Sequence, residues 1–296
     1  SKKQIEDRKL SLIDFSKNGF PSKKDEDWKF IDLNKIISSK IPKIKFSNNL
    51  VSKKIENKEI FNNISKNLLE NNYVISKNGL ITDVVLDHED KNKFSITKIP
   101  LNIKEDQYSS LGSLNKAFYL DYLKIVIKEN YKFKKPVLII NYSSPEIENT
   151  VLNQRFDLVM EKNSCMSILD LNWNLSENNF YNINNNFQLN ENSILKNYKI
   201  DLNNNSNIFY SKTKIELYKN SISENFIISS GSECSKNEIE CDLKEKFSSA
   251  FVNGIINLDV SKQHEIRSKI NHLSENTKSY QLIKCALKDK SKAVYQ

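Results

Sequence analysis

Glycine and arginine are scarce in this sequence, and each scarcity excludes a class of function. The 296 residues include five Gly and only three Arg, which are Arg8, Arg155 and Arg267. The glycines form no G-x-x-x-x-G-K-[ST] loop that could cradle nucleotide phosphates, so any ATP hydrolysis has to come from a partner. Because Arg reads guanine edges and phosphates with paired hydrogen bonds, its scarcity argues against a nucleic-acid partner.

Long apolar runs and a secretion signal are also missing. No stretch approaches the roughly 20 apolar residues that a membrane-spanning helix needs, and residues 1–10 are charged. Since nothing indicates secretion, we expect the four cysteines to be free thiols in a reducing compartment. The sequence therefore predicts a cytoplasmic protein without a membrane partner.

Lysine supplies most of the charge. The formal net charge is +8 at pH 7, and residues 1–60 contribute 15 Lys and Arg against 9 Asp and Glu. A basic arm of this kind could follow a phosphate backbone, but a lysine-rich solvated surface has the same composition. We favour the solvated surface because so few of the basic residues are Arg.

The beginning of the chain is predicted to be helical. Ile5, Leu12 and Ile13 fall on one helical face, and Gly19 followed by Pro21 ends that helix. The carboxylates of residues 25–27 then suit the positive end of a second short helix. This second helix is expected to carry Trp28, Phe30 and Leu33.

A hairpin, a helix and a strand are expected further along. Asn78-Gly79 favours a tight turn between strands at 73–75 and 81–86, because both residues tolerate positive φ. An amphipathic helix is indicated by the apolar spacing of Leu111, Leu114, Phe118, Tyr122 and Ile125. An apolar strand follows at 136–140. We assign residues 1–149 to this N-terminal α/β region.

From about residue 150 the chain alternates apolar and polar residues, which is the strand period of two. The pairs Asn163-Ser164, Asn192-Ser193 and Asn220-Ser221 recur every 28 or 29 residues, and each opens a new strand. Asn suits such turns because it enters the left-handed region at small cost. Two strands and two turns per repeat are typical of one coil of a β-solenoid, although an antiparallel sandwich has a similar strand spacing.

We therefore predict a mainly β chain, in which a right-handed parallel β-helix spans residues 150–296 after the α/β region. The alternation also predicts which side chains point into the solenoid, because successive strand residues face opposite sides. The inward set is Phe156, Leu158, Ile168, Leu217, Ile239 and Leu243.

Two segments resemble one known family beyond this patterning. Residues 20–33, FPSKKDEDWKFIDL, are similar to a motif near the N-terminus of SufD-type proteins, with Trp28 at its centre. Residues 272–294 resemble the late β-helix of the SufB/SufD family, and Ser279, Gln281, Leu282 and Lys284 match its Ser-x-Gln-Leu-x-Lys core. The chain is thus identified as a member of the SufB/SufD family of the SUF iron–sulfur cluster assembly machinery, closer to SufD than to SufB.

The resemblance implies a scaffold subunit rather than an enzyme. In this family SufD pairs with SufB through β-helix edges, both dock on the SufC ATPase, and the complete complex assembles the cluster transiently. The resemblance therefore implies no cofactor bound by this chain alone. The family's late Lys-Cys-Ser-His-Gly element has no counterpart here, so we expect a chain shortened at its C-terminus.

No cysteine is assigned to a catalytic, cofactor-binding or metal site. Cys234 and Cys241 are seven residues apart, whereas metal sites usually have gaps of roughly two to four residues. An odd offset along a strand would also put these two thiols on opposite faces. Cys165 and Cys285 lie in apolar runs and are expected to be buried.

The three histidines are likewise interpreted as structural. His88 lies in the run Asp87-His88-Glu89-Asp90, which is expected to form an exposed acidic turn. His264 and His272 are expected on different strands or turns, without a fixed geometric relation.

A β-solenoid that acts on or binds polysaccharide is the alternative function. Such an enzyme needs acidic side chains from adjacent coils in one groove. The carboxylates available for this are Asp157, Asp170, Asp201, Glu216 and Asp259. We rank this function second because a secreted enzyme normally carries a signal peptide.

Overall fold

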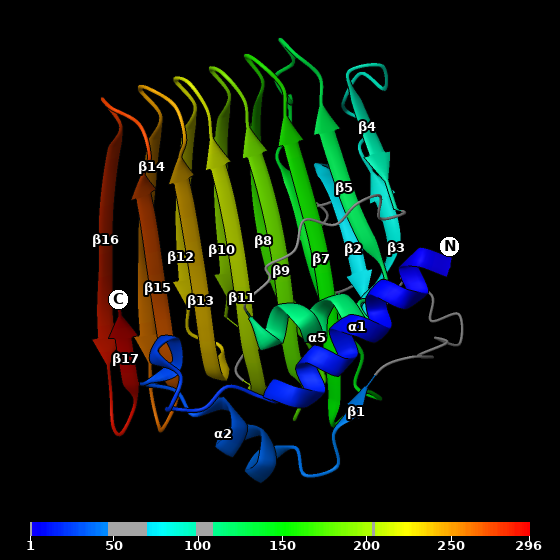
Figure 1. Cartoon of the computed structure of the whole chain (residues 1–296), viewed down its shortest axis with the longest axis vertical. Helices are drawn as coiled ribbons and strands as arrows, with labels where there is room; N and C mark the ends of the chain where they lie inside the picture. Colours follow the sequence, from blue (N-terminus) through cyan, green and yellow to red (C-terminus); the bar gives the residue numbers. More distant parts are fainter. Residues whose placement is uncertain (1, 47–69, 99–108, 203–204) are drawn as a thin grey trace.

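The computed structural model describes residues 2–46, 70–98, 109–202 and 205–296, and a parallel β-solenoid dominates it (Figure 1). The helices are α1 (Lys2–Asn18), the 3-10 helix η1 (Glu26–Trp28), α2 (Leu33–Lys40) and α5 (Ser110–Phe118). Sheet A consists, in spatial order, of β17 (Lys292–Tyr295), β15 (Gln263–His272), β13 (Ser232–Leu243), β11 (Asn205–Leu217), β9 (Phe180–Leu189), β7 (Thr150–Met160), β5 (Tyr122–Ile127) and β4 (Phe94–Thr97), with β1 (Lys45–Phe46) beside β7. Sheet B consists of β16 (Lys278–Leu287), β14 (Ser249–Leu258), β12 (Ile222–Ser229), β10 (Ile194–Asp201), β8 (Cys165–Asn174), β6 (Val137–Ser143), β2 (Asn72–Lys77) and β3 (Leu80–Val85).

Each coil places one strand in sheet B and the next strand in sheet A, and the solenoid makes about six turns. Ile194 on β10 pairs in parallel with Cys165 on β8 and with Ile222 on β12, which lie 29 and 28 residues away along the chain. Among the described strands, only β2 with β3 and β4 with β5 pair in the antiparallel direction. The predicted parallel solenoid with a repeat of about 28 residues is confirmed, and the antiparallel sandwich is wrong.

Asparagine forms the recurring turn of the solenoid. Asn130, Asn163, Asn192 and Asn220 have positive φ angles of 61°, 60°, 59° and 55°. Their side chains form a ladder in which each Nδ2 donates to the Oδ1 of the preceding coil at 2.8–3.0 Å. The hydroxyls of Ser164, Ser193 and Ser221 each donate to the backbone carbonyl three residues earlier in the chain. The Asn-Ser repeat therefore supplies both the left-handed residue and a hydrogen bond that closes the turn.

Val260 occupies a left-handed position that Asn would fill better. Its φ is 55° and its side chain is 62% exposed. A β-branched residue is strained in this region by about 1–2 kcal/mol, whereas Asn is tolerated. Val260→Asn is therefore expected to raise the free energy of unfolding by about 1–2 kcal/mol in urea denaturation. Asn220→Val is the converse variant and should destabilise the protein; an unchanged midpoint for Val260→Asn would contradict the argument.

The interior of the solenoid contains an apolar core that runs from Val74 to Ile266. The side chains predicted to point inward all belong to this core and are at most 7% exposed: Phe156, Leu158, Ile168, Leu217, Ile239 and Leu243. The strand register predicted from the alternation is therefore confirmed. Since β5 and β6 already belong to the two sheets, the coils continue without a break across residue 150.

The N-terminal helices lie on the outer face of sheet A (Figure 1). A second apolar cluster joins them to the strands, with Phe15, Trp28, Leu33, Leu111 and Leu114 packed against Phe180, Ile208, Tyr210 and Cys234. The hairpin between β2 and β3 turns at Asn78 and Gly79, whose φ angles are 53° and 84°, as predicted. The strand expected at 136–140 is β6.

The first predicted helix is confirmed, since α1 ends at Asn18 directly before Gly19, although its apolar face lies at the surface. Ile5, Leu12 and Ile13 are 59%, 39% and 65% exposed, because α1 packs against α5, and its Phe15 contacts Phe20 and Phe46. The later helix prediction is wrong in part. The helix expected to continue to Ile125 ends as α5 at Phe118. Tyr122 and Ile125 belong to β5 instead, which pairs in parallel with β7.

The second short helix is divided in two. Trp28 ends η1, whereas Leu33 begins α2. The division occurs at Asp32, whose carboxylate accepts the backbone N–H of Lys35 at 3.0 Å and so caps the start of α2. Phe30 lies between the two helices and is 39% exposed, while Trp28 and Leu33 are buried.

Candidate functional site

Cys234 and Cys241 lie on the same strand, β13, and face in opposite directions. Cys234 packs beneath the N-terminal helices with Trp28 and Tyr210, whereas Cys241 belongs to the core inside the solenoid. Burial raises the pKa of each thiol to about 12, so neither is a thiolate at neutral pH. The prediction of opposite faces is confirmed, and these two sulfurs do not form a common ligand pair.

Cys165 and Cys285 lie nearer the surface than predicted. Cys165 is half-buried at the start of β8, where Met166 and Ile168 take the inward positions. Cys285 is exposed on β16, where it pairs in register with Ile256 of β14. The expectation of a buried side chain is therefore wrong for Cys285 and only partly met for Cys165.

His264 and His272 occupy the two ends of a single strand, β15, so the expectation of different strands or turns is wrong. His264 is fully buried. Its Nε2 donates to the carbonyl of Ser232 at 2.6 Å, and the hydroxyl of Ser229 donates to its Nδ1 at 2.8 Å. Burial lowers the pKa of His264 to about 4, so the ring is neutral at pH 7.

The other two histidines lie at the surface. The ring nitrogens of His272 are 2.7 Å from the hydroxyl of Thr277 and 3.1 Å from that of Ser279. His88 is exposed as predicted, but the acidic turn around it is only partly exposed, because Glu89 is buried and accepts hydrogen bonds from Asn72 and Tyr131. Within the described ranges, no three His, Cys, Asp or Glu side chains are placed so that they could hold a metal ion. None of the helices described there has the length and apolar composition needed to cross a bilayer.

The five carboxylates considered for a polysaccharide site do not share one groove. Asp157 and Glu216 lie on the outer face of sheet A and line the same hollow. Asp170 and Asp201 are buried, on the side of their strands that faces into the solenoid. Asp259 lies between β14 and β15 and pairs with a lysine. The alignment that this function requires is therefore not formed.

A polar network inside the solenoid was not predicted. The Nζ of Lys199 on β10 lies 3.6 Å from Asp170 on β8 and donates to the hydroxyl of Ser211 at 2.5 Å. Asn141 on β6 donates to Asp170 at 2.7 Å. Burial raises the pKa of Asp170 and lowers the pKa of Lys199. The network links three successive strands of sheet B, and Asp170 shares the inward parity of Ile168.

Buried charges fix the segment around Trp28 to sheet A. The Nζ of Lys236 on β13 lies 4.8 Å from the centre of the Trp28 ring and donates to the carbonyl of Asp27 at 2.5 Å. Lys236 also forms a close ion pair with Glu265 on β15. Arg267 lies 2.6 Å from the carboxylate of Asp27, and its hydrogen bond lowers the pKa of Asp27.

The segment that carries the C-terminal resemblance forms β16 and β17. The hydroxyls of Ser268 and Tyr295 both donate to Gln281, which ties β16 to β15 and β17. The side chain of Gln263 on β15 donates to the carbonyl of Phe30 at 2.7 Å. The N-terminal segment therefore contacts β15, which pairs directly with β17 of the C-terminal segment.

Comparison with known proteins gives one finding. The family model described as SUF system FeS cluster assembly, SufBD core domain, matches residues 142–296, which is more than half of the chain. No curated protein matches the sequence. The matched residues begin in β6 and take in every later described strand of both sheets, so the match lies within the solenoid. The chain belongs to the SufBD core family of the SUF system for iron–sulfur cluster assembly.

Proposed function

We propose that this chain is the SufD-type scaffold subunit of the SUF complex, pairing with SufB and docking on the SufC ATPase. The observation that carries the proposal is the position of Trp28. The motif around Trp28 resembles that of SufD-type proteins. Lys236 on β13 and Arg267 on β15 bind Asp27 of this motif, and both strands lie within the residues that the family model matches. The iron–sulfur cluster is cargo of the complex in this proposal, and the chain itself is not an enzyme.

Exposed apolar side chains on β16 support contact with another subunit. Among the described strands, β16 pairs with β14. On β16, Tyr280, Leu282 and Leu287 are 53%, 43% and 50% exposed. A group of exposed apolar side chains is suited to contact with a protein partner. We propose that SufB contacts these side chains.

The thiols support the view that a cluster needs the partners. Cys234 and Cys241 are separated by the thickness of sheet A and have raised pKa values because they are buried. Thiolate ligands have to be deprotonated and convergent. The chain alone is therefore expected to assemble no stoichiometric cluster.

Anaerobic reconstitution with iron and sulfide tests this function. The chain alone should show neither cluster absorption nor ATP hydrolysis, whereas a mixture with SufB and SufC should show both. The chain should also elute with SufB in size-exclusion chromatography. Leu282→Lys with Leu287→Lys should prevent this co-elution, and Ile5→Lys with Ile13→Lys on α1 is the matched control. A cluster near one per isolated chain that Cys241→Ser removes would overturn the scaffold assignment.

The polysaccharide function has no specific observation in its favour. Of its five carboxylates, only Asp157 and Glu216 share a hollow. Glu216 is held by Lys244 at 2.7 Å, and Asp157 accepts the hydroxyl of Tyr122 at 2.7 Å. We therefore do not pursue it.

A further inference from the structure

An apolar strip crosses four successive strands on the outer face of sheet B. Strand pairing places its first row on β8, β10 and β12, and its second row two residues further along these strands and on β14. Tyr198 and Ile255 are its most exposed members, at 37% and 40%, and the others are partly exposed. The sheet B strip consists of Leu169, Tyr198 and Phe226 in the first row and Leu171, Ile200, Ile228 and Ile255 in the second.

The sheet B strip points away from the core of the solenoid. Ile168, Leu195 and Ile227 lie on the same strands at positions of opposite parity, and they are core residues at most 3% exposed. Because successive strand residues face opposite sides, the strip lies on the outer face. Leu169 and Leu171 belong to an apolar cluster whose members all come from β2, β6 and β8, so no described helix contributes to it.

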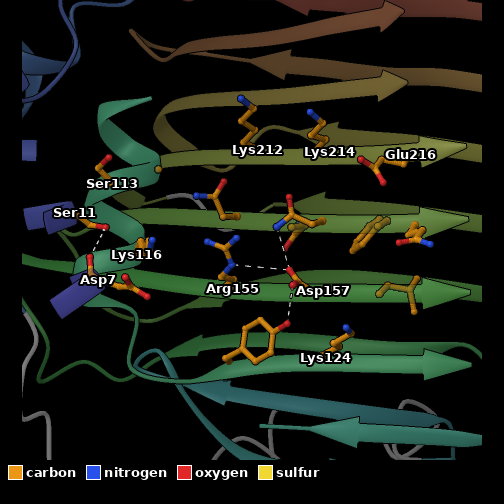
Figure 2. A pocket seen from close by; sticks show the side chains of 18 of the residues that line it. Asp7, Ser11, Ser113, Lys116, Lys124, Arg155, Asp157, Lys212, Lys214 and Glu216 are labelled. Atoms are coloured by element: carbon orange, nitrogen blue, oxygen red, sulfur yellow. Dashed lines mark hydrogen bonds and ion pairs between the residues drawn. The ribbon is translucent and has the colours of Figure 1, made fainter. Parts of the chain in front are cut away.

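Helices cover the corresponding face of sheet A. α5 contacts β7 and β9, and its Leu111 and Leu114 are fully buried in the cluster that joins the helices to these strands. Figure 1 shows α1 and α5 crossing the strands of sheet A obliquely. Beside the helices the outward side chains are charged, as Figure 2 shows for Asp157, Lys212 and Lys214. Apolar outward positions on sheet A are therefore the ones that a helix covers.

The backbone of the strip is already paired. β8, β10, β12 and β14 each have a strand neighbour on both sides in sheet B, so their N–H and C=O groups are used within the sheet. A strand of another protein finds no backbone partner on such a face. A helix bonds its own backbone and needs side-chain contact alone, so it suits this surface.

The size of the strip also favours a helix. Four strands about 4.8 Å apart and two rows about 7 Å apart give it an area of about 270 Å². A stable interface between two copies of a chain needs about 800 Å² on each partner. Three turns of helix are about 16 Å long, which matches the width of the four strands.

The margin of the strip carries a compensated ion pair. Lys196 and Glu224 lie side by side on β10 and β12, two residues before the first row, and their charged groups are 3.7 Å apart. This margin therefore offers a partner no net charge. Recognition at the strip rests on apolar contact, which a phosphate backbone cannot supply.

We propose that the sheet B strip is a docking site for an amphipathic helix of a partner protein, which lies across β8, β10, β12 and β14 with its apolar side on Ile200 and Ile228. The site is separate from the contact proposed for SufB on β16. Asn253 ends the first row before Leu282, and Lys284 follows Ile255 in the second.

A designed peptide of about 18 residues, long enough to form a helix, tests this site. It contains Ala, has Leu at every third or fourth position, and carries equal numbers of Glu and Lys on the opposite side. Trp173 reports locally, because it is partly exposed on the same face of β8, two residues after Leu171, whereas Trp28 is buried. We expect one peptide per chain in calorimetry and a blue shift of the Trp fluorescence. A scrambled peptide of the same composition should bind at least tenfold more weakly.

Two double variants locate the binding. Tyr198→Thr with Ile255→Thr should weaken the binding of the peptide at least tenfold, and Thr preserves the preference for a strand. Leu282→Lys with Leu287→Lys is the matched control on the same sheet, and it should bind the peptide as the wild type does. Because this control alters the contact proposed for SufB, failure of that contact and failure of the helix site are distinguishable.

Four results would overturn the proposal. The wild type could fail to bind the peptide at millimolar concentration, or it could bind the scrambled peptide equally well. The variant at Tyr198 and Ile255 could retain full affinity, which would place the peptide elsewhere. Self-association of the wild-type chain that this variant abolishes would assign the strip to a second copy instead of a helix.

Discussion

Lys236→Met is expected to lower the free energy of unfolding by about 3–5 kcal/mol at pH 7, because it leaves a buried carboxylate without its partner. Lys236 is 1% exposed, and its partner Glu265 is fully buried. The same ammonium binds the carbonyl of Asp27 and faces the ring of Trp28, so the substitution also loosens the N-terminal segment. Urea denaturation monitored by Trp fluorescence measures both effects.

The double variant Lys236→Met with Glu265→Gln separates these causes. Burial raises the pKa of Glu265, which shows how costly its charge is once the lysine is gone. The second carboxylate beside Lys236, that of Glu238, keeps Arg267 at 3.7 Å and the hydroxyl of Tyr210, so the double variant should recover most of the lost stability. Lys269→Met is the matched control on the same sheet face, where the pair with Glu240 is 3.7 Å long and the lysine side chain is 59% exposed. This control should cost less than about 1 kcal/mol, and an equal loss of stability in the two single variants would refute the argument.

The strand period of two predicted most of the solenoid. Alternation assigns each residue to one face, so the inward position of Leu217 and the opposite faces of Cys234 and Cys241 followed directly from counting. The Asn-Ser repeat gave the length of a coil because its turn needs a left-handed residue at every pass. Both signals are local, and local signals are available in a single sequence.

Local spacing failed where a distant partner decides the structure. Tyr122 and Ile125 fit a helical spacing, but β5 pairs with β7, which lies some thirty residues later. The exposed apolar face of α1 shows the same effect, since α1 packs against α5, and Phe15 contacts Phe20 and Phe46. Nothing near Ile5 or Ile13 indicates which side of α1 these partners would contact.

The buried charges were missed for a different reason. Asp170 has the inward parity of Ile168 two residues earlier, yet a charged residue in a strand is ordinarily assigned to the outer face. Its burial depends on Lys199 one coil later, 29 residues along the chain. Lys236 similarly depends on Asp27 and Trp28, more than 200 residues away. The hollow that Asp157 and Glu216 line beside α1 also arises from the packing of distant segments, so no sequence motif indicates it.

The acid stability of the protein is expected to depend on His264. Its pKa is lowered from 6.5 to about 4 by burial, to which the charge of Lys262 adds. Between these two pH values the unfolded chain binds a proton that the folded chain does not, so the folded state loses stability as the pH falls. A difference of about 2.5 pKa units corresponds to a loss of about 3 kcal/mol, complete near pH 4 and absent above about pH 6.5.

His264→Gln isolates this contribution, because the amide can still donate to the carbonyl of Ser232 but does not titrate. Asp170, Asp201 and Glu265 also have pKa values raised by burial, and their protonation acts in the opposite direction. Those groups are common to both proteins, so the difference between the two stability curves cancels them. The free energy of unfolding, measured from pH 7 to pH 4, should fall by about 3 kcal/mol more in the wild type than in the variant. Parallel curves across that range would show that His264 is not held as a neutral buried ring, and that its protonated Nδ1 donates a hydrogen bond to the hydroxyl oxygen of Ser229.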